Sequence, residues 1–186
     1  MQQTNLTSHF LIAMPSLKDP NFEKSVTYIC AHNEEGAMGI VINKPLDIDL
    51  GEIFEQMDIP TNNQDAKGKT IFHGGPVHTD RGFILHQTNN EWDSSIIISD
   101  EMCVTTSKDI LEAIAAGDGP TESLIALGYA GWAEGQLEQE IMDNAWLSGP
   151  ADSEIIFKTP FDQCWNTAVS HMGIDIEKLS LDIGHA

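Results

Sequence analysis

Short apolar runs separated by polar turns dominate the chain and predict strands more often than helices. Phe10–Ala13 is a compact apolar run that ends just before Pro15. Residues 23–31 have β-type composition and two mostly apolar faces, which is typical of a central strand. Asn33–Gly36 reads as a turn, and a second apolar run follows at residues 37–43. The pair of runs therefore predicts a β-hairpin.

Helical periodicity appears in four places. Asp49 and Glu52 have the spacing of a capping box, and apolar residues follow at helical spacing up to Met57, just before Pro60. Comparable start and stop signals predict three more helices, over residues 106–117, 136–144 and 159–173, the last with Thr159 as its cap.

The remaining segments predict strands and loops. Residues 61–69 read as a polar loop without an apolar anchor. Further strands are expected over residues 70–73, 83–86, 95–99, 123–129, 145–147 and 154–158. Short, numerous strands that only partly alternate with helices favour an α+β fold over a doubly wound α/β sheet. The length of 186 residues and the 41% hydrophobic share indicate one compact domain, residues 1–186, with a substantial core.

The densest group of candidate chemistry lies in residues 70–87. Gly74 and Gly75 precede Pro76, and such a loop can expose successive N–H groups as an anion-binding concavity. Arg81 could add a bidentate fork for a carboxylate or phosphate. The alternative is a tight crossover between strands, with Arg81 paired to a carboxylate. The loop lacks the GxxxxGK[ST] continuation of a nucleotide-binding P-loop.

Three histidines accompany this loop. His73 and His86 could approach each other across neighbouring strands and supply a general base, with His78 nearby in sequence. Their spacing matches no zinc pattern, and the sequence holds neither HExxH nor paired CxxC motifs. We therefore expect no metal and no cofactor.

Two other positions are candidate ligand-binding residues. Asn43, at a strand end before Pro45, could position a ligand or bridge two loops. Trp132 follows a glycine-rich strand end and could line a pocket, or it could fill a corner of the core. The nearby Glu134, Glu138 and Glu140 are expected on a solvated helix face.

The net charge indicates which classes of partner the protein can bind, and the cysteine content indicates its cellular compartment. The chain has 9 basic and 29 acidic residues and a formal charge of −20, which gives no electrostatic source for non-specific binding to DNA or RNA and opposes docking on anionic membranes. Cys30, Cys103 and Cys164 are far apart, as expected for reduced thiols. The N-terminal apolar run is too short for a signal peptide, and no stretch approaches a membrane span. These features predict a cytoplasmic protein.

Five motifs in order resemble the YqgE/AlgH family of bacterial proteins: FLIAMP (10–15), GAMGIVINKP (36–45), HGGPV with RGFILH (73–86), GYAGW with GQLEQEI (128–141), and the final GHA. The resemblance implies an α+β domain whose branched β-sheet curls into a pseudo-barrel flanked by helices. The AlgH name marks a proposed role in transcriptional regulation of alginate production. The resemblance implies no catalytic or cofactor residues, and it places as pattern residues Gly74, Gly75, Pro76, Arg81, Gly128, Trp132 and Gln136.

These observations favour a non-enzymatic binding or regulatory protein. It would act through a protein partner or a small anionic ligand, and indirectly on transcription, because no helix-turn-helix with a basic second helix is visible. The alternative is a hydrolase in which Gly74, Gly75 and Arg81 bind an anionic substrate and His73 or His86 acts as base. A structural subunit of a larger assembly is a third hypothesis.

Overall fold

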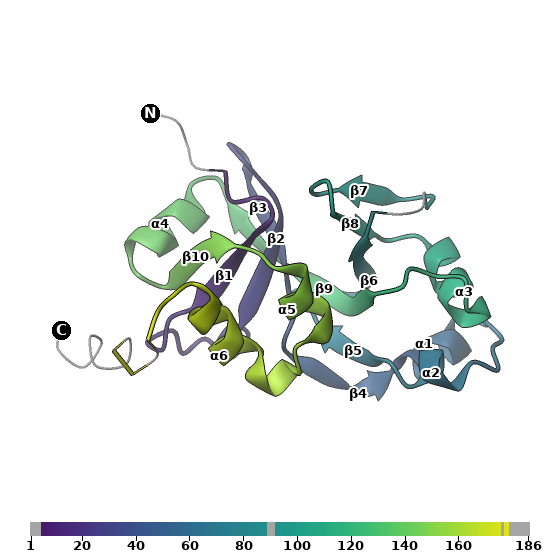
Figure 1. Ribbon diagram of the computed structural model, residues 1–186. Coiled ribbons are helices and arrows are strands. Elements are labelled where there is room, and N and C mark those ends of the chain that lie inside the picture. The colour runs from purple at the N-terminus through teal and green to yellow at the C-terminus, as the bar shows by residue number, and fades with distance from the viewer. Residues whose placement is uncertain (1–4, 89–91, 176, 179–186) are drawn as a thin grey trace.

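The computed structural model describes residues 5–88, 92–175 and 177–178, and within them the strands form one curled sheet with helices around it (Figure 1). The strands are β1 (His9–Ala13), β2 (Val26–Asn33), β3 (Gly36–Val41), β4 (Pro45–Asp49), β5 (Thr70–His73), β6 (Val77–Gln87), β7 (Ser95–Ile97), β8 (Met102–Thr105), β9 (Ser123–Ala133) and β10 (Trp146–Pro150). The helices are α1 (Leu50–Gln56), α2 (Gln64–Lys67), α3 (Lys108–Ala116), α4 (Gln136–Met142), α5 (Ser153–Lys158) and α6 (Phe161–His171).

The sheet is branched at β9. Its main path runs β10-β1-β2-β3-β9-β6-β8-β7, and every neighbouring pair on that path is antiparallel. One edge of β9 pairs with β6, while the other edge pairs with β3 at Ala130–Ala133 and with β5, in parallel, at Ile125–Leu127. β4 then pairs antiparallel with β5. The predicted α+β class and branched mixed sheet are therefore confirmed.

Three apolar clusters hold the helices to the sheet. The largest joins sheet residues such as Tyr28 and Leu85 to Ile155 of α5 and Trp165 of α6. A second packs α1 and α3 against β5, β6 and β9, and a third packs α4 beside β9 and β10. In Figure 1, α5 and α6 lie in front of β1 and β2, and α1 to α3 lie at the opposite end of the molecule. The pocket described below lies between α5, α6 and the sheet.

The locally encoded elements form as predicted. The hairpin of β2 and β3 closes at Asn33 and Gly36. The capping box of α1 is complete, because the Asp49 side chain accepts from the Glu52 backbone N–H and the Glu52 side chain accepts from that of Asp49. Gly117 ends α3 in the left-handed conformation.

The prediction of a strand over residues 154–158 is wrong, because these residues belong to the helix α5. The Asp152 side chain accepts a hydrogen bond from the Glu154 backbone N–H and so provides an N-cap that a β-rich composition does not reveal. The adjacent Ile155 and Ile156 are both buried. Thr159 ends α5 instead of capping α6, which begins after Pro160 without a side-chain cap.

Other segments also differ from the prediction. No strand was expected at β8 (Met102–Thr105) or over the first half of β6, before residue 83. The expected loop at 61–69 contains α2, whose N-cap Asn63 accepts from the Ala66 backbone N–H; buried Ala66 is the apolar anchor, too small to stand out in a polar run. β4 begins at Pro45, where a strand was expected to end, and a proline is tolerated at the first residue of a strand.

None of the helices within the described ranges is long and apolar enough to span a membrane.

Candidate functional site

The Gly74-Gly75 loop lies at the fork of the sheet. The Gly74 N–H donates to Leu127 O of β9 at 2.8 Å, and the Val41 N–H of β3 donates to Gly74 O at 2.9 Å. A Cβ atom on Gly75, whose φ is +154°, would lie 2.1 Å from the carbonyl carbon of Tyr129. The loop therefore brings three backbone segments into direct contact, and the fold already uses the Gly74 amide that an anion would need.

Arg81 and the candidate bases lie on different parts of the sheet. Arg81 is exposed on the stretch of β6 between Val77 and Gly82 where the pairing with β9 is irregular, and its Cζ lies 5.7 Å from the centroid of the Phe83 ring. His73 on β5 and His86 on β6 flank opposite edges of β9. β9 therefore runs between the two histidines that the sequence suggested could meet.

The side chain of His86 is hydrogen-bonded inside the core. Its ring is fully buried, Nδ1 donates to Gln87 O at 2.9 Å, and Nε2 lies 2.6 Å from Thr105 Oγ1. Burial lowers the pKa of His86, so the ring stays neutral and Nε2 accepts from the Thr105 hydroxyl. The lone pair that a general base requires is occupied by this hydrogen bond.

Asn43 bridges two segments. Its Oδ1 accepts from the Val26 N–H at 2.9 Å and its Nδ2 donates to Lys24 O at 3.0 Å. Lys24 has a φ of +55°, a left-handed conformation that costs energy for a residue with a side chain. The buried amide thus holds the turn before β2 against the end of β3.

Trp132 fills a core corner together with Trp146. The two rings are 6.1 Å apart in an edge-to-face arrangement, and both indole N–H groups donate to Glu140 Oε1, at 3.2 and 3.0 Å. Gln136 Nε2 donates to the other oxygen of Glu140 at 2.9 Å. The expectation of a solvated face was wrong for Glu140, because two buried indole donors require an acceptor.

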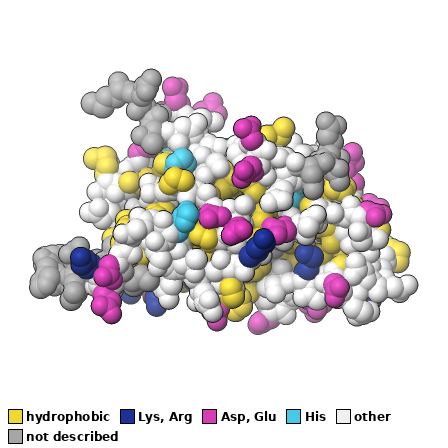
Figure 2. Space-filling view, in the orientation of Figure 1, with side chains coloured by type: hydrophobic (Ala, Val, Ile, Leu, Met, Phe, Trp, Pro, Cys, Tyr) yellow, Lys and Arg dark blue, Asp and Glu magenta, His cyan; other side chains and the backbone are white. Residues whose placement is uncertain are grey.

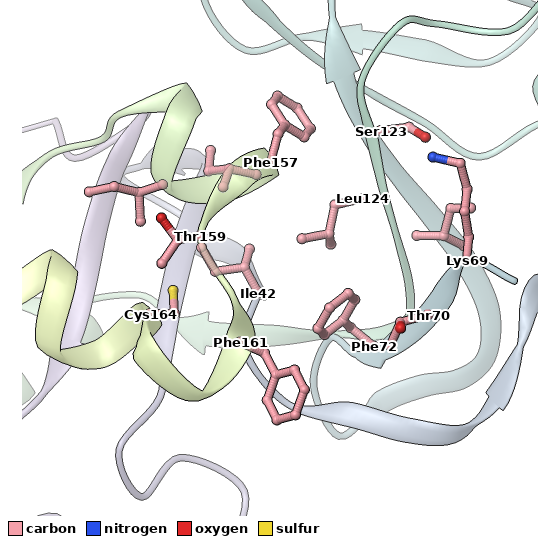
Figure 3. A pocket seen from close by; sticks show the side chains of 13 residues that line it. Ile42, Lys69, Thr70, Phe72, Ser123, Leu124, Phe157, Thr159, Phe161 and Cys164 are labelled. Carbon is pink, nitrogen blue, oxygen red and sulfur yellow. The ribbon is translucent and has the colours of Figure 1, made fainter. Parts of the chain in front are cut away.

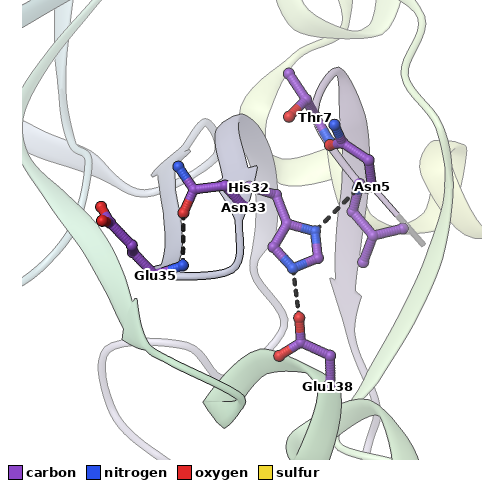
Figure 4. A network of polar contacts seen from close by, with 7 residues as sticks. Asn5, Thr7, His32, Asn33, Glu35 and Glu138 are labelled. Atoms are coloured by element: carbon purple, nitrogen blue, oxygen red, sulfur yellow. Dashed lines mark hydrogen bonds and ion pairs between the residues drawn. The ribbon is translucent and has the colours of Figure 1, made fainter. Parts of the chain in front are cut away.

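A second carboxylate on α4 also faces inward. Glu138 Oε1 lies 2.6 Å from Nε2 of His32, a buried residue of β2, and His32 Nδ1 accepts from the Leu6 N–H at 3.0 Å (Figure 4). Both ring nitrogens are therefore used, and the network ties the N-terminal segment and α4 to the sheet. The sequence carried no signal for this pair, because only the tertiary fold brings β2 and α4 together.

The thiols are buried and free. Cys30, Cys103 and Cys164 form no disulfide. Burial raises the pKa of Cys30 and of Cys164 to about 12, and it raises the pKa of Cys103 as well. The reactive thiolate is therefore scarce at neutral pH.

This burial predicts slow reaction of the native protein with Ellman's reagent at about pH 8, because a thiol with a pKa near 12 is only about one part in ten thousand thiolate there. All three cysteines should react within the mixing time once guanidinium chloride unfolds the chain. Rapid modification of one cysteine in the native protein, followed by absorbance, would contradict the buried state described here.

A cavity that the sequence did not predict lies between α5, α6 and the β5–β9 part of the sheet. Its volume is about 220 Å³. Phe72 of β5, Leu124 of β9, Phe157 of α5 and Phe161 of α6 line it together with polar residues such as Thr70 and Thr159 (Figure 3). Its lining therefore combines aromatic side chains with polar groups.

The polar groups of this pocket lie mainly at one end. Among the described residues that line the pocket, Lys69 is the one charged side chain and none is a carboxylate. Ser123 Oγ is buried and has no hydrogen-bond partner in the described part of the chain. β5 and β9 pair in parallel with Ile71 opposite Ile125, so Lys69 and Ser123, each two residues earlier, lie at the same level of the sheet. Because successive side chains of a strand point to opposite faces, both project on the side of Ile71 and Ile125, away from Phe72 and Leu124.

The surroundings of the pocket are acidic. Figure 2 shows Asp and Glu side chains spread over the face that carries α5 and α6, with few Lys and Arg side chains among them. The cation in the pocket lining is therefore an exception to the −20 charge of the chain.

Comparison with known proteins gives consistent matches over nearly the whole chain. A family model described as AlgH-like matches residues 10–177. A UPF0301 protein of Photobacterium profundum is 52% identical over 98% of this chain and 100% of that protein, and one of Thioalkalivibrio sulfidiphilus is 58% identical over 98% of each. The solution structure of AlgH from Pseudomonas aeruginosa is 46% identical, has a TM-score of 0.81, and covers 100% of both chains. A crystal structure of a Corynebacterium diphtheriae protein shares the fold, with 20% identity and a TM-score of 0.72 over 92% of this chain and 89% of that one.

Proposed function

The chain belongs to the AlgH-like family, and from this premise we propose that it is a non-enzymatic binding protein that holds a small ligand between α5, α6 and the sheet. The observation that carries the proposal is the cavity of about 220 Å³ between α5, α6 and the sheet. A formed cavity favours binding, because the cost of ordering the site has been met by folding.

The residues that line the pocket come from both the helices and the sheet, and this supports a regulatory role for ligand binding. Phe157 belongs to α5 and Phe161 to the first turn of α6, whereas Phe72 and Leu124 belong to the sheet. A ligand that contacts both layers would bias the position of the two helices, and with it the surface offered to a protein partner. The charge of −20 favours such a partner, in the cytoplasm, over direct contact with DNA.

The hydrolase alternative has less support. It requires Arg81 and a histidine base at one anionic substrate, but Arg81 lies over Phe83 and β9 runs between His73 and His86. The lone pair of His86 is occupied by Thr105. We therefore propose binding without turnover.

The proposal predicts that benzyl alcohol, a neutral aromatic probe, binds with a dissociation constant on the order of a millimolar. In ¹H–¹⁵N correlation spectra its addition should shift the amides of Phe72, Leu124 and Phe157 most. Thr70→Trp places an indole at the rim of the pocket from an exposed position and should weaken binding at least about tenfold.

Thr79→Trp is the matched control, because Thr79 is an exposed threonine of the same sheet outside the pocket lining. That variant should bind the probe as the wild type does. Shifts scattered over the surface, or equal binding by both tryptophan variants, would contradict the proposed function.

A further inference from the structure

We infer that the free edge of β7 is a docking site for an extended, basic segment of a partner protein, which adds to the sheet as a further strand. β7 lies at the outer end of the sheet, and none of its residues lines the pocket (Figure 1). The inference therefore goes beyond the proposed function, and either of the two can fail without the other.

The first argument is the set of unpaired backbone groups along this edge. β7 is the last strand of the main path, and within the described residues β8 is its only partner strand. The Thr106 N–H donates to Ser94 O at 3.0 Å, so the facing residues Ser95 and Thr105 share no backbone hydrogen bond. By alternation, the N–H and C=O groups of Ser95 and Ile97 point away from β8. Such a row of groups is a template for an added strand.

The second argument is the apolar surface beside this edge. Ile96 and Ile97 are 57% and 75% exposed, and they are two of the four large apolar side chains that are exposed in the described part of the chain. Successive side chains point to opposite faces, so one isoleucine lies on each face of β7. An added strand covers both with its own side chains. Natural edge strands are commonly protected by lysine or proline, and β7 contains neither.

The third argument is charge, which indicates the kind of partner. Asp93 precedes β7, Asp100 and Glu101 lie in the connection to β8, and all three residues are exposed. None of the three carboxylates forms an ion pair within the described residues. Lysine or arginine side chains at both ends of an incoming strand would therefore meet unpaired carboxylates at both ends of β7.

A second copy of this chain fits the same edge poorly. If two β7 strands pair antiparallel with Ser95 opposite Ile97, then Asp93 of one copy lies opposite Ser99 of the other and beside its Asp100. Like charges at neighbouring positions disfavour the pairing, and each copy carries a formal charge of −20. The charge therefore favours a basic partner over self-association.

The test titrates the full chain with three blocked peptides. The first alternates valine and threonine between paired lysines at each end and should bind with a dissociation constant on the order of 100 μM. The second has glutamates in place of the lysines, and the third keeps the lysines but has a central proline, which removes a donor. Both should bind at least about tenfold more weakly. Saturation with the first peptide should slow hydrogen exchange of the Ser95 and Ile97 amides at least about threefold.

Substitutions at Ile97 test the edge directly. Ile97→Pro removes an N–H that takes no part in the pairing with β8, and proline is tolerated on an edge strand in that orientation. The variant should bind the first peptide at least about tenfold more weakly. Ile97→Thr keeps the N–H and loses apolar surface, so it should weaken binding about threefold. Met142→Thr is the matched control, because Met142 is also 75% exposed but lies on α4, and it should bind as the wild type does.

If Ile97→Pro fails to fold, Ile97→Thr and the exchange rates of the wild type still test the inference. Equal binding of the two lysine peptides, full binding by the Ile97 variants, or no binding of the first peptide at millimolar concentration would overturn it. A wild-type dimer that Ile97→Pro dissociates would also overturn it, by assigning the edge to a second copy. In each of these cases the binding of benzyl alcohol in the pocket would be unaffected.

Discussion

Replacing Gly128 with alanine is expected to lower the free energy of unfolding by more than about 4 kcal/mol or to prevent folding. Gly128 has a φ of +80°, and an added Cβ would lie 2.3 Å from Gly75 O and 3.2 Å from Val77 O. Both neighbours are backbone atoms at the fork of the sheet, so neither can move aside without breaking the pairing of β9.

Substitutions at two other glycines separate the cost of the left-handed conformation from the cost of the backbone contact. Gly135 has a φ of +75° with no atom within 4 Å of an added Cβ, so Gly135→Ala measures the left-handed conformation alone and should cost about 1 kcal/mol. Gly82 of β6 also has open space and no positive φ, so Gly82→Ala should change stability by less than about 0.5 kcal/mol. Urea unfolding gives all three values. A Gly128→Ala cost no larger than that of Gly135→Ala would show that the backbone contact at the fork is not needed.

Replacing Glu140 with alanine is expected to cost about 3 kcal/mol, the second largest effect. The substitution leaves the buried indole N–H groups of Trp132 and Trp146 without their acceptor, and it also removes the partner of Gln136. An unsatisfied buried donor costs more than the net gain from a hydrogen bond, so the two indoles dominate the loss. Glu140→Gln keeps one carbonyl oxygen and should lose about half as much.

Glu134→Ala, at an exposed position just before α4, is the control and should be neutral within about 0.5 kcal/mol. Urea unfolding followed by tryptophan fluorescence measures both effects, because the two indoles report on the same corner. A Glu140→Ala variant as stable as Glu134→Ala would show that water can replace the carboxylate at this site.

Elements whose signals are local were predictable from the sequence. The capping box at Asp49 and Glu52, the turn between Asn33 and Gly36, and the left-handed cap at Gly117 each operate within a few residues. The strand prediction for residues 154–158 was wrong for a related reason. The N-cap at Asp152 starts a helix there, whereas the apolar run suggested a strand. Local caps can outweigh β-type composition in a short segment.

The pocket was beyond sequence reasoning, because its residues meet only through long-range pairing. Phe72 and Leu124 are brought to one face by the parallel pair β5–β9, and Phe157 depends on a helix that was predicted as a strand. The Gly74-Gly75 loop did attract attention, but the contact that explains it involves Gly128, far along the chain. The spacing of residues within one motif cannot reveal a backbone contact between two motifs that are far apart in the sequence.

The measurement that tests the account most directly is a crystal structure of the protein with 4-bromobenzyl alcohol, located by the anomalous scattering of bromine. We expect a bromine peak between Phe72, Leu124 and Phe157. Bromine density elsewhere on the molecule, with the space between α5 and β9 filled by its own side chains, would contradict the account.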